Sequence, residues 1–468
     1  MLPPLVRQFL VAGSTHLAAI SAGGVVAYPG VVLHQLQAND TIIQLDLDNG
    51  SWIGSVHGIA GLPTIFLPFL MQYRGRKLVF MISCFFMVIG WTFTYSAQSV
   101  KTLIIGECFH GLGINSILTV SVLSVSEMVR PKYRNMCLVL YSTFQILGTS
   151  VVSILGGYLH WKTVSIVMGS PVLLALAIGC VWPESPAWLA YKGKYEKCEQ
   201  VFERLRGTDE ESKRELKALL SSKEVVEPIS ARTFKDLKKM ATSRTFYLPT
   251  LHTFLLINVL YWCGGISVVV YGNDMILKTS GKHNGQIKLI MDILIFVGYN
   301  IAAVLVRYVS SKKVMLSSMS GSAVFMMLAG IVTYLQGLGS LSKDSEWGAY
   351  CLVGFITFFS LGAVGIGFSI ASEIIPVKHR GIGGCLYVIF TCVLHSSSLK
   401  AYPYLCLYIN VWGVFFIYAV YGLFSILCIW RYVPDTSNRT LKEIEDYYAC
   451  GYFKERKINE SVNEPFIE

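Results

Sequence analysis

The sequence predicts an all-α membrane protein built from about twelve transmembrane helices that form two halves of six. Hydrophobic residues make up 53% of the 468-residue chain and charged residues only 15%, too few to cover the surface of a soluble protein of this length. Apolar windows of about 20 residues, the length that crosses a bilayer as a helix, recur along the whole chain. A segment at 126–134 is also repeated in similar form at 372–380.

The windows predict the position of each span and the division of the chain. We place them at about 8–29, 51–71, 78–98, 102–123, 135–158, 163–182, 247–272, 287–306, 314–336, 348–371, 381–399 and 404–432, with the eleventh and twelfth separated around Lys400 and Pro403. We therefore expect a six-helix bundle at 1–182, a cytoplasmic helical linker at 183–246, a second six-helix bundle at 247–433 and a cytoplasmic tail at 434–468. Alternating charges predict linker helices at 195–206 and 211–222, with a third short one at 234–240.

The positive charge indicates topology rather than a nucleic-acid partner. The formal net charge is +10, and lysine and arginine gather in alternate loops, in the linker and in the C-terminal tail. Loops rich in basic residues stay on the cytoplasmic side of a membrane. We expect a multi-pass protein of the cell membrane with both termini in the cytoplasm, the lipid bilayer as its surroundings and no nucleic-acid partner. In the first outside loop, Asn39 begins an Asn-Asp-Thr acceptor for N-glycosylation.

The repeated segment places a glutamate and an arginine at the foot of each half. Glu127 precedes Arg134 by seven residues, and Glu373 precedes Arg380 by the same interval. Both pairs lie where one apolar window ends and the next begins, which is typical of a secondary transporter with two related halves. Such charges can pair across the halves when the cytoplasmic side closes, or they can be solvated loop charges. Our candidates for gating charges are Arg76, Glu127, Arg134, Glu184, Glu373 and Arg380.

Short motifs lie at the ends of several spans, in addition to the two repeated segments. They are Gly50-Ser51-Trp52-Ile53-Gly54, Arg74-Gly75-Arg76-Lys77, Pro183-Glu184-Ser185-Pro186-Ala187-Trp188-Leu189 and Pro434-Asp435-Thr436-Ser437-Asn438-Arg439-Thr440-Leu441. Together they resemble the motifs of the sugar porter branch of the major facilitator superfamily, in particular the insect facilitated trehalose transporter-like group. The resemblance covers nearly the whole chain, and it implies the twelve-helix fold of that superfamily, a small-molecule sugar as substrate, and transport between two conformations.

The predicted sugar site departs from the family pattern. Amides that the family carries in the seventh span fall on Tyr261, Trp262 and Ser267, and the tryptophan of the tenth span falls on Phe368. Gln145 remains either a hydrogen-bond donor to a sugar or a buried amide bonded to a neighbouring helix. The resulting candidates for substrate binding are Gln145, Trp262, Ser267, Tyr271, Phe368 and Thr391.

Ionisable residues inside the spans are candidates for proton binding. The first span contains no aspartate or glutamate, which favours facilitated diffusion over proton symport. Asp292 and Glu107 are the carboxylates that could instead serve as a proton site. We interpret His57, His110 and His395 as buried polar groups whose hydrogen bonds are satisfied, rather than as a proton relay.

These observations predict a uniporter for a sugar such as trehalose, or for a related hexose or polyol. A proton-coupled sugar symporter and a non-transporting receptor related to sugar porters are the alternatives. We expect no enzyme activity, because no nucleophile–base set emerges, and no cofactor, metal or obligate protein partner. The twelve cysteines form no metal-ligand spacing and are interpreted as packing residues.

Overall fold

The computed structural model describes residues 3–38, 43–221, 239–375, 380–437, 439 and 441–453. Helices make up nearly all of this part of the chain, and it contains no strand, so the predicted all-α class is confirmed. Asn39 lies outside the described residues, as do most of the predicted helix at 234–240 and the side chain of Arg380.

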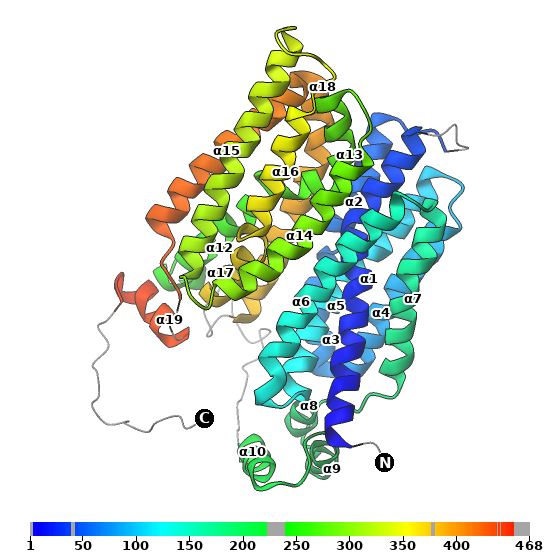
Figure 1. Ribbon diagram of the computed structural model, residues 1–468. Helices are drawn as coiled ribbons and strands as arrows, with labels where there is room; N and C mark the ends of the chain where they lie inside the picture. The colour runs from blue at the N-terminus through cyan, green and yellow to red at the C-terminus, as the bar shows by residue number, and fades with distance from the viewer. Residues whose placement is uncertain are drawn as a thin grey trace.

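The chain forms two bundles that stand side by side (Figure 1). The first bundle contains α1 (Pro4–Ala38), α2 (Leu47–Ala60), the short 3₁₀ helix η1 (Leu62–Phe66), α3 (Leu67–Arg74), α4 (Arg76–Tyr95), α5 (Val100–Met128), α6 (Pro131–Gly156) and α7 (Trp161–Cys180). The second contains α12 (Arg244–Trp262), α13 (Gly265–Ser280), α14 (Gly285–Leu305), α15 (Ser311–Gly337), α16 (Trp347–Ser360), α17 (Ala363–Ile374) and α18 (Arg380–Tyr432).

The span count agrees with the prediction once α18 is divided. Within the described residues, eleven helical segments are long and apolar enough to cross a membrane, and the last of them has 51 residues. A bilayer needs only about 20 residues, so this segment supplies two spans. The backbone turns at Asn410, whose φ is 59° and ψ is 170°. The predicted division near Lys400 and Pro403 is therefore wrong, because the helix continues through both residues.

Two features explain why α18 divides at Asn410 rather than at Pro403. Proline is tolerated inside transmembrane helices, where neighbouring groups satisfy the backbone carbonyl that it leaves free. Asparagine accepts positive φ more readily than most residues other than glycine. A second break separates α12 from α13 at Gly264, which has a φ of 92°. Both breaks lie in the second half. The break at Asn410 separates two spans, and the break at Gly264 divides one span into α12 and α13.

Short helices cover the end of the molecule at which the N-terminal residues lie (Figure 1). The linker provides α8 (Pro186–Tyr191), α9 (Tyr195–Arg206) and α10 (Glu210–Ser221), and α19 (Leu441–Cys450) lies below the second bundle. The bounds of α9 match the prediction, and α10 begins one residue earlier than expected. We call this the termini end and the opposite one the distal end. A small apolar core holds the linker helices together, formed by Trp188, Leu189, Cys198, Phe202 and Leu216.

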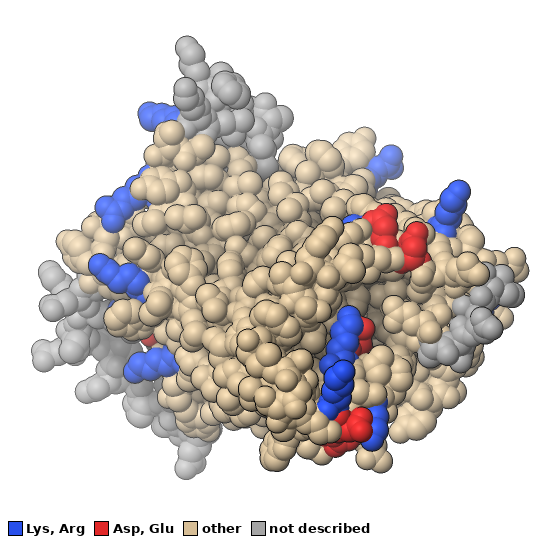
Figure 2. Space-filling model, turned by 90° about the horizontal axis from the view of Figure 1, so that it is seen from above, with Lys and Arg blue, Asp and Glu red and all other residues tan. Residues whose placement is uncertain are grey.

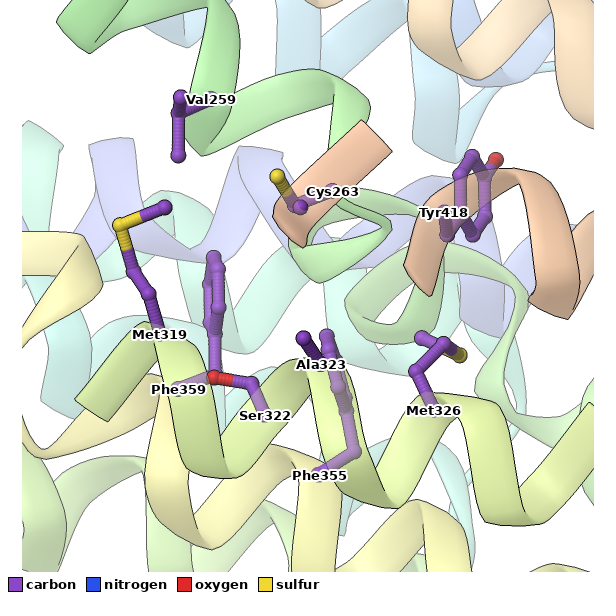
Figure 3. Close-up of a pocket in the computed structure, with 10 residues that line it drawn as sticks. Val259, Cys263, Met319, Ser322, Ala323, Met326, Phe355, Phe359 and Tyr418 are labelled. Carbon is purple, nitrogen blue, oxygen red and sulfur yellow. The ribbon is translucent and has the colours of Figure 1, made fainter. Parts of the chain in front are cut away.

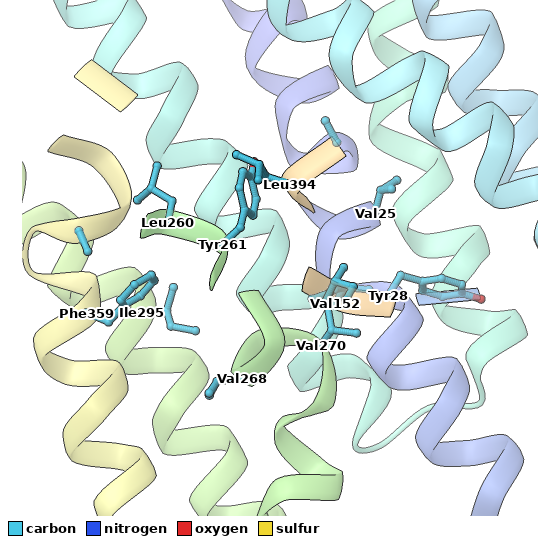
Figure 4. Packing of buried hydrophobic residues seen from close by; sticks show 14 of the residues in the cluster. Val25, Tyr28, Val152, Leu260, Tyr261, Val268, Val270, Ile295, Phe359 and Leu394 are labelled. Atoms are coloured by element: carbon cyan, nitrogen blue, oxygen red, sulfur yellow. The ribbon is translucent and has the colours of Figure 1, made fainter. Parts of the chain in front are cut away.

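The hydrophobic core continues from one bundle into the other. Figure 4 shows Val25 and Tyr28 of α1 with Val270 of α13 and Tyr261 of α12 among the buried residues of one cluster. A Cβ atom added to Gly30 of α1 would lie 2.2 Å from the carbonyl oxygen of Val270. Only a residue without a side chain permits this approach, so the two bundles contact each other through backbone as well as side chains.

Glycine also sets the distance between α1 and α6 inside the first bundle. A Cβ on Gly23 would lie 1.8 Å from the carbonyl oxygen of Gln145, and a Cβ on Gly148 would lie 1.9 Å from that of Ile20. The two helices therefore place a glycine each against the backbone of the other. Any larger residue forces them apart.

We predict that Gly148→Ala lowers the melting temperature of the purified chain, because the added methyl group cannot fit without moving α1. Overpacking of this kind costs about 1–3 kcal/mol. Gly13→Ala is the matched control, since nothing lies within 4 Å of its added Cβ and the gain in helix propensity is the same. Equal melting temperatures for the two variants would contradict the close approach of α1 and α6.

Candidate functional site

The two bundles are joined at the distal end by an ionic contact, which we call the distal latch. The Nζ of Lys400 on α18 lies 2.6 Å from the Oδ1 of Asp48 on α2. The hydroxyl of Tyr404 donates to the same Oδ1 at 2.7 Å, and the Lys400 ammonium lies 4.1 Å from the ring centroid of Trp52. Figure 2, which views the distal face, shows few charged side chains there. The latch is therefore a local feature of a mostly uncharged surface.

Further contacts continue this closure toward the middle of the molecule. The Ser396 hydroxyl donates to the carbonyl of Ser55 at 2.6 Å and accepts from the backbone N–H of Ile59 at 2.7 Å. On the other side of the interface, the Ser150 hydroxyl of α6 donates to the carbonyl of Asp292 on α14 at 2.8 Å. The described contacts thus close the two bundles together from the distal end inward.

Two of the predicted substrate residues are already engaged with other protein groups. The Ser267 hydroxyl lies 3.0 Å from the hydroxyl of Tyr418 and is fully buried inside the second bundle. Tyr271 donates to the carbonyl of Leu399 at 3.1 Å, and its ring stacks on Tyr402 with 4.6 Å between centroids. In this conformation neither side chain is free to bind a sugar, and Tyr271 contributes to the distal closure instead.

The other four candidates are partly buried. Gln145 lies on α6 and Thr391 on α18, two helices that contact the other bundle, whereas Trp262 ends α12 and Phe368 lies on α17, which pack within the second bundle. The buried hydroxyl oxygen of Thr391 has no hydrogen-bond partner among the described residues. The ring of Phe368 meets that of Tyr387 edge-on at 6.5 Å. This set offers an unpaired hydroxyl, an amide and two aromatic rings.

Two cavities lie elsewhere in the second bundle. The first, of about 10 Å³, lies among Met319, Met326, Phe355 and Phe359 (Figure 3) and has room for about one water molecule. It is a packing defect rather than a binding site. The second, of about 400 Å³, is a groove at the termini end of α12 and α18. The groove has a suitable size for a small ligand but an apolar lining, formed by Ala241, Phe246, Tyr247, Thr250, Leu251, Phe254 and Phe390.

At the termini end, three predicted gating charges lie together within the first bundle. The Nη2 of Arg76 lies 2.8 Å from the Oε1 of Glu127, and the backbone N–H of Arg76 donates to Glu184 at 2.7 Å. The Ser185 hydroxyl also donates to Glu127. Gly75 permits this turn, because its φ is 94° and an added Cβ would lie 2.2 Å from Glu184. The cluster therefore connects α4, α5 and the start of α8 in one half.

The second bundle repeats part of this arrangement. Glu373 accepts a hydrogen bond from Thr436 at 2.7 Å, as Glu127 accepts one from Ser185. The ammonium of Lys312 donates to the carbonyls of Trp430 and Val433 at the end of α18, as Lys77 donates to Cys180 at the end of α7. The internal repeat is thus visible in individual hydrogen bonds. Each glutamate fastens the segment that follows its own bundle.

None of the described gating charges pairs with the other half in this conformation. Arg134 keeps a buried Nε without a hydrogen-bond partner among the described residues, and Arg380 is described only by its backbone. Pairing across the halves remains a prediction for a state in which the termini end is closed. In the present state the charges stabilise each bundle separately.

The two candidate proton sites have different surroundings. Asp292 forms an ion pair with Lys288 one helical turn away, so its charge is already balanced. Glu107 is buried on α5, and its only ion-pair partners among the described residues are the imidazoles of His57 and His110. The Nδ1 of His110 bonds Glu107, but among the described residues both nitrogens of His57 and the Nε2 atoms of His110 and His395 have no hydrogen-bond partner, so the expectation of fully satisfied histidines fails for His57 and holds only in part for the other two.

Sequence reasoning also missed the distal latch. The predicted spans separate at Lys400, and the sequence indicates no role for Asp48. Their positions carried a usable signal, since both fall at the predicted outside ends of spans and have opposite charges. Tyr418, which engages Ser267, had no such signal, because a tyrosine in an apolar window is indistinguishable from other packing residues.

We predict that Arg76→Ala lowers thermal stability by loosening α8 from α4 and α5. Loss of one partner leaves the half-buried Glu127 without its cation, which costs about 1–3 kcal/mol. Lys213→Ala is the control, since the Lys213–Glu210 pair lies exposed on one helix and is expected to contribute little. Melting curves of the two variants at equal purity test this. The assignment fails if Arg76→Ala melts at the same temperature as Lys213→Ala.

Comparison with known proteins shows the family to which this sequence belongs. The sequence model of the "Sugar (and other) transporter" family matches residues 47–448. The sugar transporter ERD6-like 1 of Arabidopsis thaliana is 24% identical over 438 residues, which cover 91% of this chain and 92% of that protein. The facilitated trehalose transporter Tret1 of Apis mellifera ligustica is 24% identical over 456 residues, which cover 94% of this chain and 88% of that protein.

Solved structures show the same architecture. The xylose transporter XylE from E. coli, in its inward open conformation, has a TM-score of 0.73 at 16% sequence identity, with 94% of this chain and 99% of that one covered. The proton:xylose symporter XylE bound to 6-bromo-6-deoxy-D-glucose has a TM-score of 0.71, also at 16% identity, with 95% and 99% covered. Because the family model matches most of its length, this chain belongs to the sugar transporter family and has the fold of the major facilitator superfamily.

Proposed function

We propose that the chain is a uniporter that carries trehalose, or a related hexose or polyol, across the plasma membrane by alternating access. The observation that supports this most is the closure of the two bundles at one end by contacts that can separate. These are one ionic latch and a few hydrogen bonds from serine hydroxyls. Such contacts are weak enough that an open and a closed distal end can differ by only a few kcal/mol.

The charges on the chain support a cytoplasmic location for the termini end. The Lys312 and Lys77 ammonium groups and the Arg76 guanidinium all lie there, together with the linker helices α9 and α10, which carry lysines and arginines alongside an equal number of glutamates. Basic residues favour the cytoplasmic side. The distal end then faces outward, and the closed latch corresponds to an inward-facing state.

Binding of a polar cargo is supported by the four partly buried candidates, two of which lie on helices that contact the other bundle. A sugar is bound by hydrogen bonds together with stacking on aromatic rings. Gln145 and Thr391 supply polar groups, while Trp262 and Phe368 supply rings. Fewer amides are present than the family pattern leads one to expect. We therefore propose a site that binds its substrate with low affinity, which suits a protein that transports the substrate down its concentration gradient.

Uniport is favoured over symport by the first helix. The described part of the chain includes all of α1, Pro4–Ala38, and this helix contains no aspartate or glutamate. Symport remains the second candidate, because Glu107 and its two histidine partners place a titratable group inside the membrane-spanning region. The third candidate is a receptor that binds sugar without transporting it. Such a protein would have the same fold but would not alternate between two conformations.

We predict that proteoliposomes containing the full chain take up labelled trehalose or glucose down a concentration gradient, and that the internal concentration reaches but does not exceed the external one, with or without an imposed proton gradient. The measurement is the time course of uptake with and without the proton gradient, against empty liposomes. Accumulation above equilibrium that requires the proton gradient would establish symport instead. Binding without uptake of any sugar tested would establish the receptor.

A matched pair of variants locates the site in the same assay. Thr391→Val removes the unpartnered buried hydroxyl at nearly constant volume, and we expect it to raise KM several-fold, since a hydrogen bond to cargo contributes about 0.5–1.5 kcal/mol. Thr357→Val is the control, because its hydroxyl bonds the carbonyl of Val353 within its own helix. Equal KM values for both variants would remove Thr391 from the site.

A further inference from the structure

A cluster of three histidines and one glutamate lies at the junction of the two halves; His57, Glu107 and His110 are buried and His395 is partly buried. The Oε2 of Glu107 lies 3.5 Å from the Nδ1 of His57, and its Oε1 lies 3.3 Å from the Nδ1 of His110. From the second half, the ring of His395 meets that of His57 at 4.7 Å in a T-shaped contact. The exposed fractions are 2% for His57, 2% for Glu107 and 0% for His110. We call these four residues the proton cluster.

The cluster has no fixed positive charge. Among the described residues, Glu107 has no lysine or arginine within 4.0 Å, and the ion pairs that it forms are only with the two histidines. The surrounding titratable groups are phenols and thiols, which carry no charge near neutral pH. They are Tyr28 on α1, Cys108 on α5, Tyr261 on α12 and Cys392 on α18. Helix α4 contributes the uncharged Trp91.

This environment determines how many protons the closed cluster holds. A buried carboxylate without a cation costs several kcal/mol, so an ionised Glu107 between neutral imidazoles is strongly disfavoured. One bound proton removes the imbalance, whether it lies on the carboxyl group or on an imidazole that then pairs with the carboxylate. A second proton would leave the buried cluster with a net charge of +1 and no anion to balance it. The closed cluster is therefore most stable with one proton.

We propose that His57, Glu107, His110 and His395 form a proton-binding site shared by the two halves, and that the bound proton favours closure of the distal end. The contact that makes the site shared is the ring pair of His57 on α2 and His395 on α18. It lies directly beside the Ser396 hydrogen bonds that close these same two helices. From the second half, the Tyr261 ring meets that of His395 at 5.2 Å, and Figure 4 shows Leu394 beside Tyr261.

Parting of α2 and α18 breaks the ring pair and admits water. Hydration stabilises the Glu107 carboxylate, so the proton is held less tightly in the open state. By linkage, acid favours the closed distal end and alkali favours the open one. The response is sought between about pH 5 and pH 8, the range in which an unperturbed imidazole changes charge.

The first test detects the proton without any substrate. The ring centroid of Trp91 lies 4.4 Å from that of His110, so its emission responds to the charge of the cluster. Fluorescence of the purified full chain minus that of Trp91→Phe isolates this residue. We expect one transition between about pH 5 and pH 8, lost in Glu107→Gln. His252→Gln is the control, because this buried histidine bonds Tyr448 away from the cluster. A flat titration, or a transition retained in Glu107→Gln, overturns the proposal.

The second test measures the coupling to conformation. Spin-labelled unnatural residues replace Tyr158 and Leu338, which are exposed at the distal end of the first and second halves. We expect the short label-to-label distance to dominate at about pH 5 and a longer one to gain population at about pH 8. Glu107→Gln, which imitates the protonated carboxyl group, is expected to stay short at both. Identical distributions at both pH values in the unaltered chain overturn the coupling even where uptake of sugar is normal.

Discussion

The closure between α2 and α18 is the constraint on which the present arrangement depends. These two helices come from different halves, and they are held by the Asp48–Lys400 pair at the distal end and by Ser396 nearer the middle. Neither contact is strong by itself. The apolar core that crosses the junction and the backbone contact at Gly30 hold the halves in register, while the polar contacts determine which end is closed. A transporter needs both kinds of contact, because its halves must stay together and still move relative to each other.

The charges of the internal repeat have a different task in this state. Glu127 and Glu373 each fasten the segment that follows their own bundle, through Ser185 and Thr436. Each half is thereby a rigid unit with its linker or tail attached. Rigid halves are what allow small changes at the junction to move a whole bundle. We expect Glu127 and Glu373 each to pair with an arginine of the other half when the termini end closes, as the sequence predicts.

The sequence predicted the features that depend on local composition. Apolar windows located the spans, and charge alternation located α9 with its observed bounds. Features set by contacts between distant residues could not be predicted in this way. Lys400 and Asp48 are 352 positions apart, and Ser267 meets Tyr418 across 151 positions. The break at Asn410 could not be predicted either, because proline at 403 is the stronger sequence signal for a break. The histidines lie far apart in the sequence, and only the fold brings His57 and His110 to Glu107 and His395 to His57.

The central claim is that this chain alternates between a state closed at the distal end and a state closed at the termini end. Hydrogen–deuterium exchange of the full chain in lipid nanodiscs, with and without a sugar that it transports, tests this most directly. The account predicts changes of opposite sign at the two ends. When the sugar binds, the amides of residues 47–60 and 392–404 become less protected from exchange and those of residues 126–134 become more protected, or the reverse. Changes of the same sign at both ends, or none with a transported sugar, would contradict it.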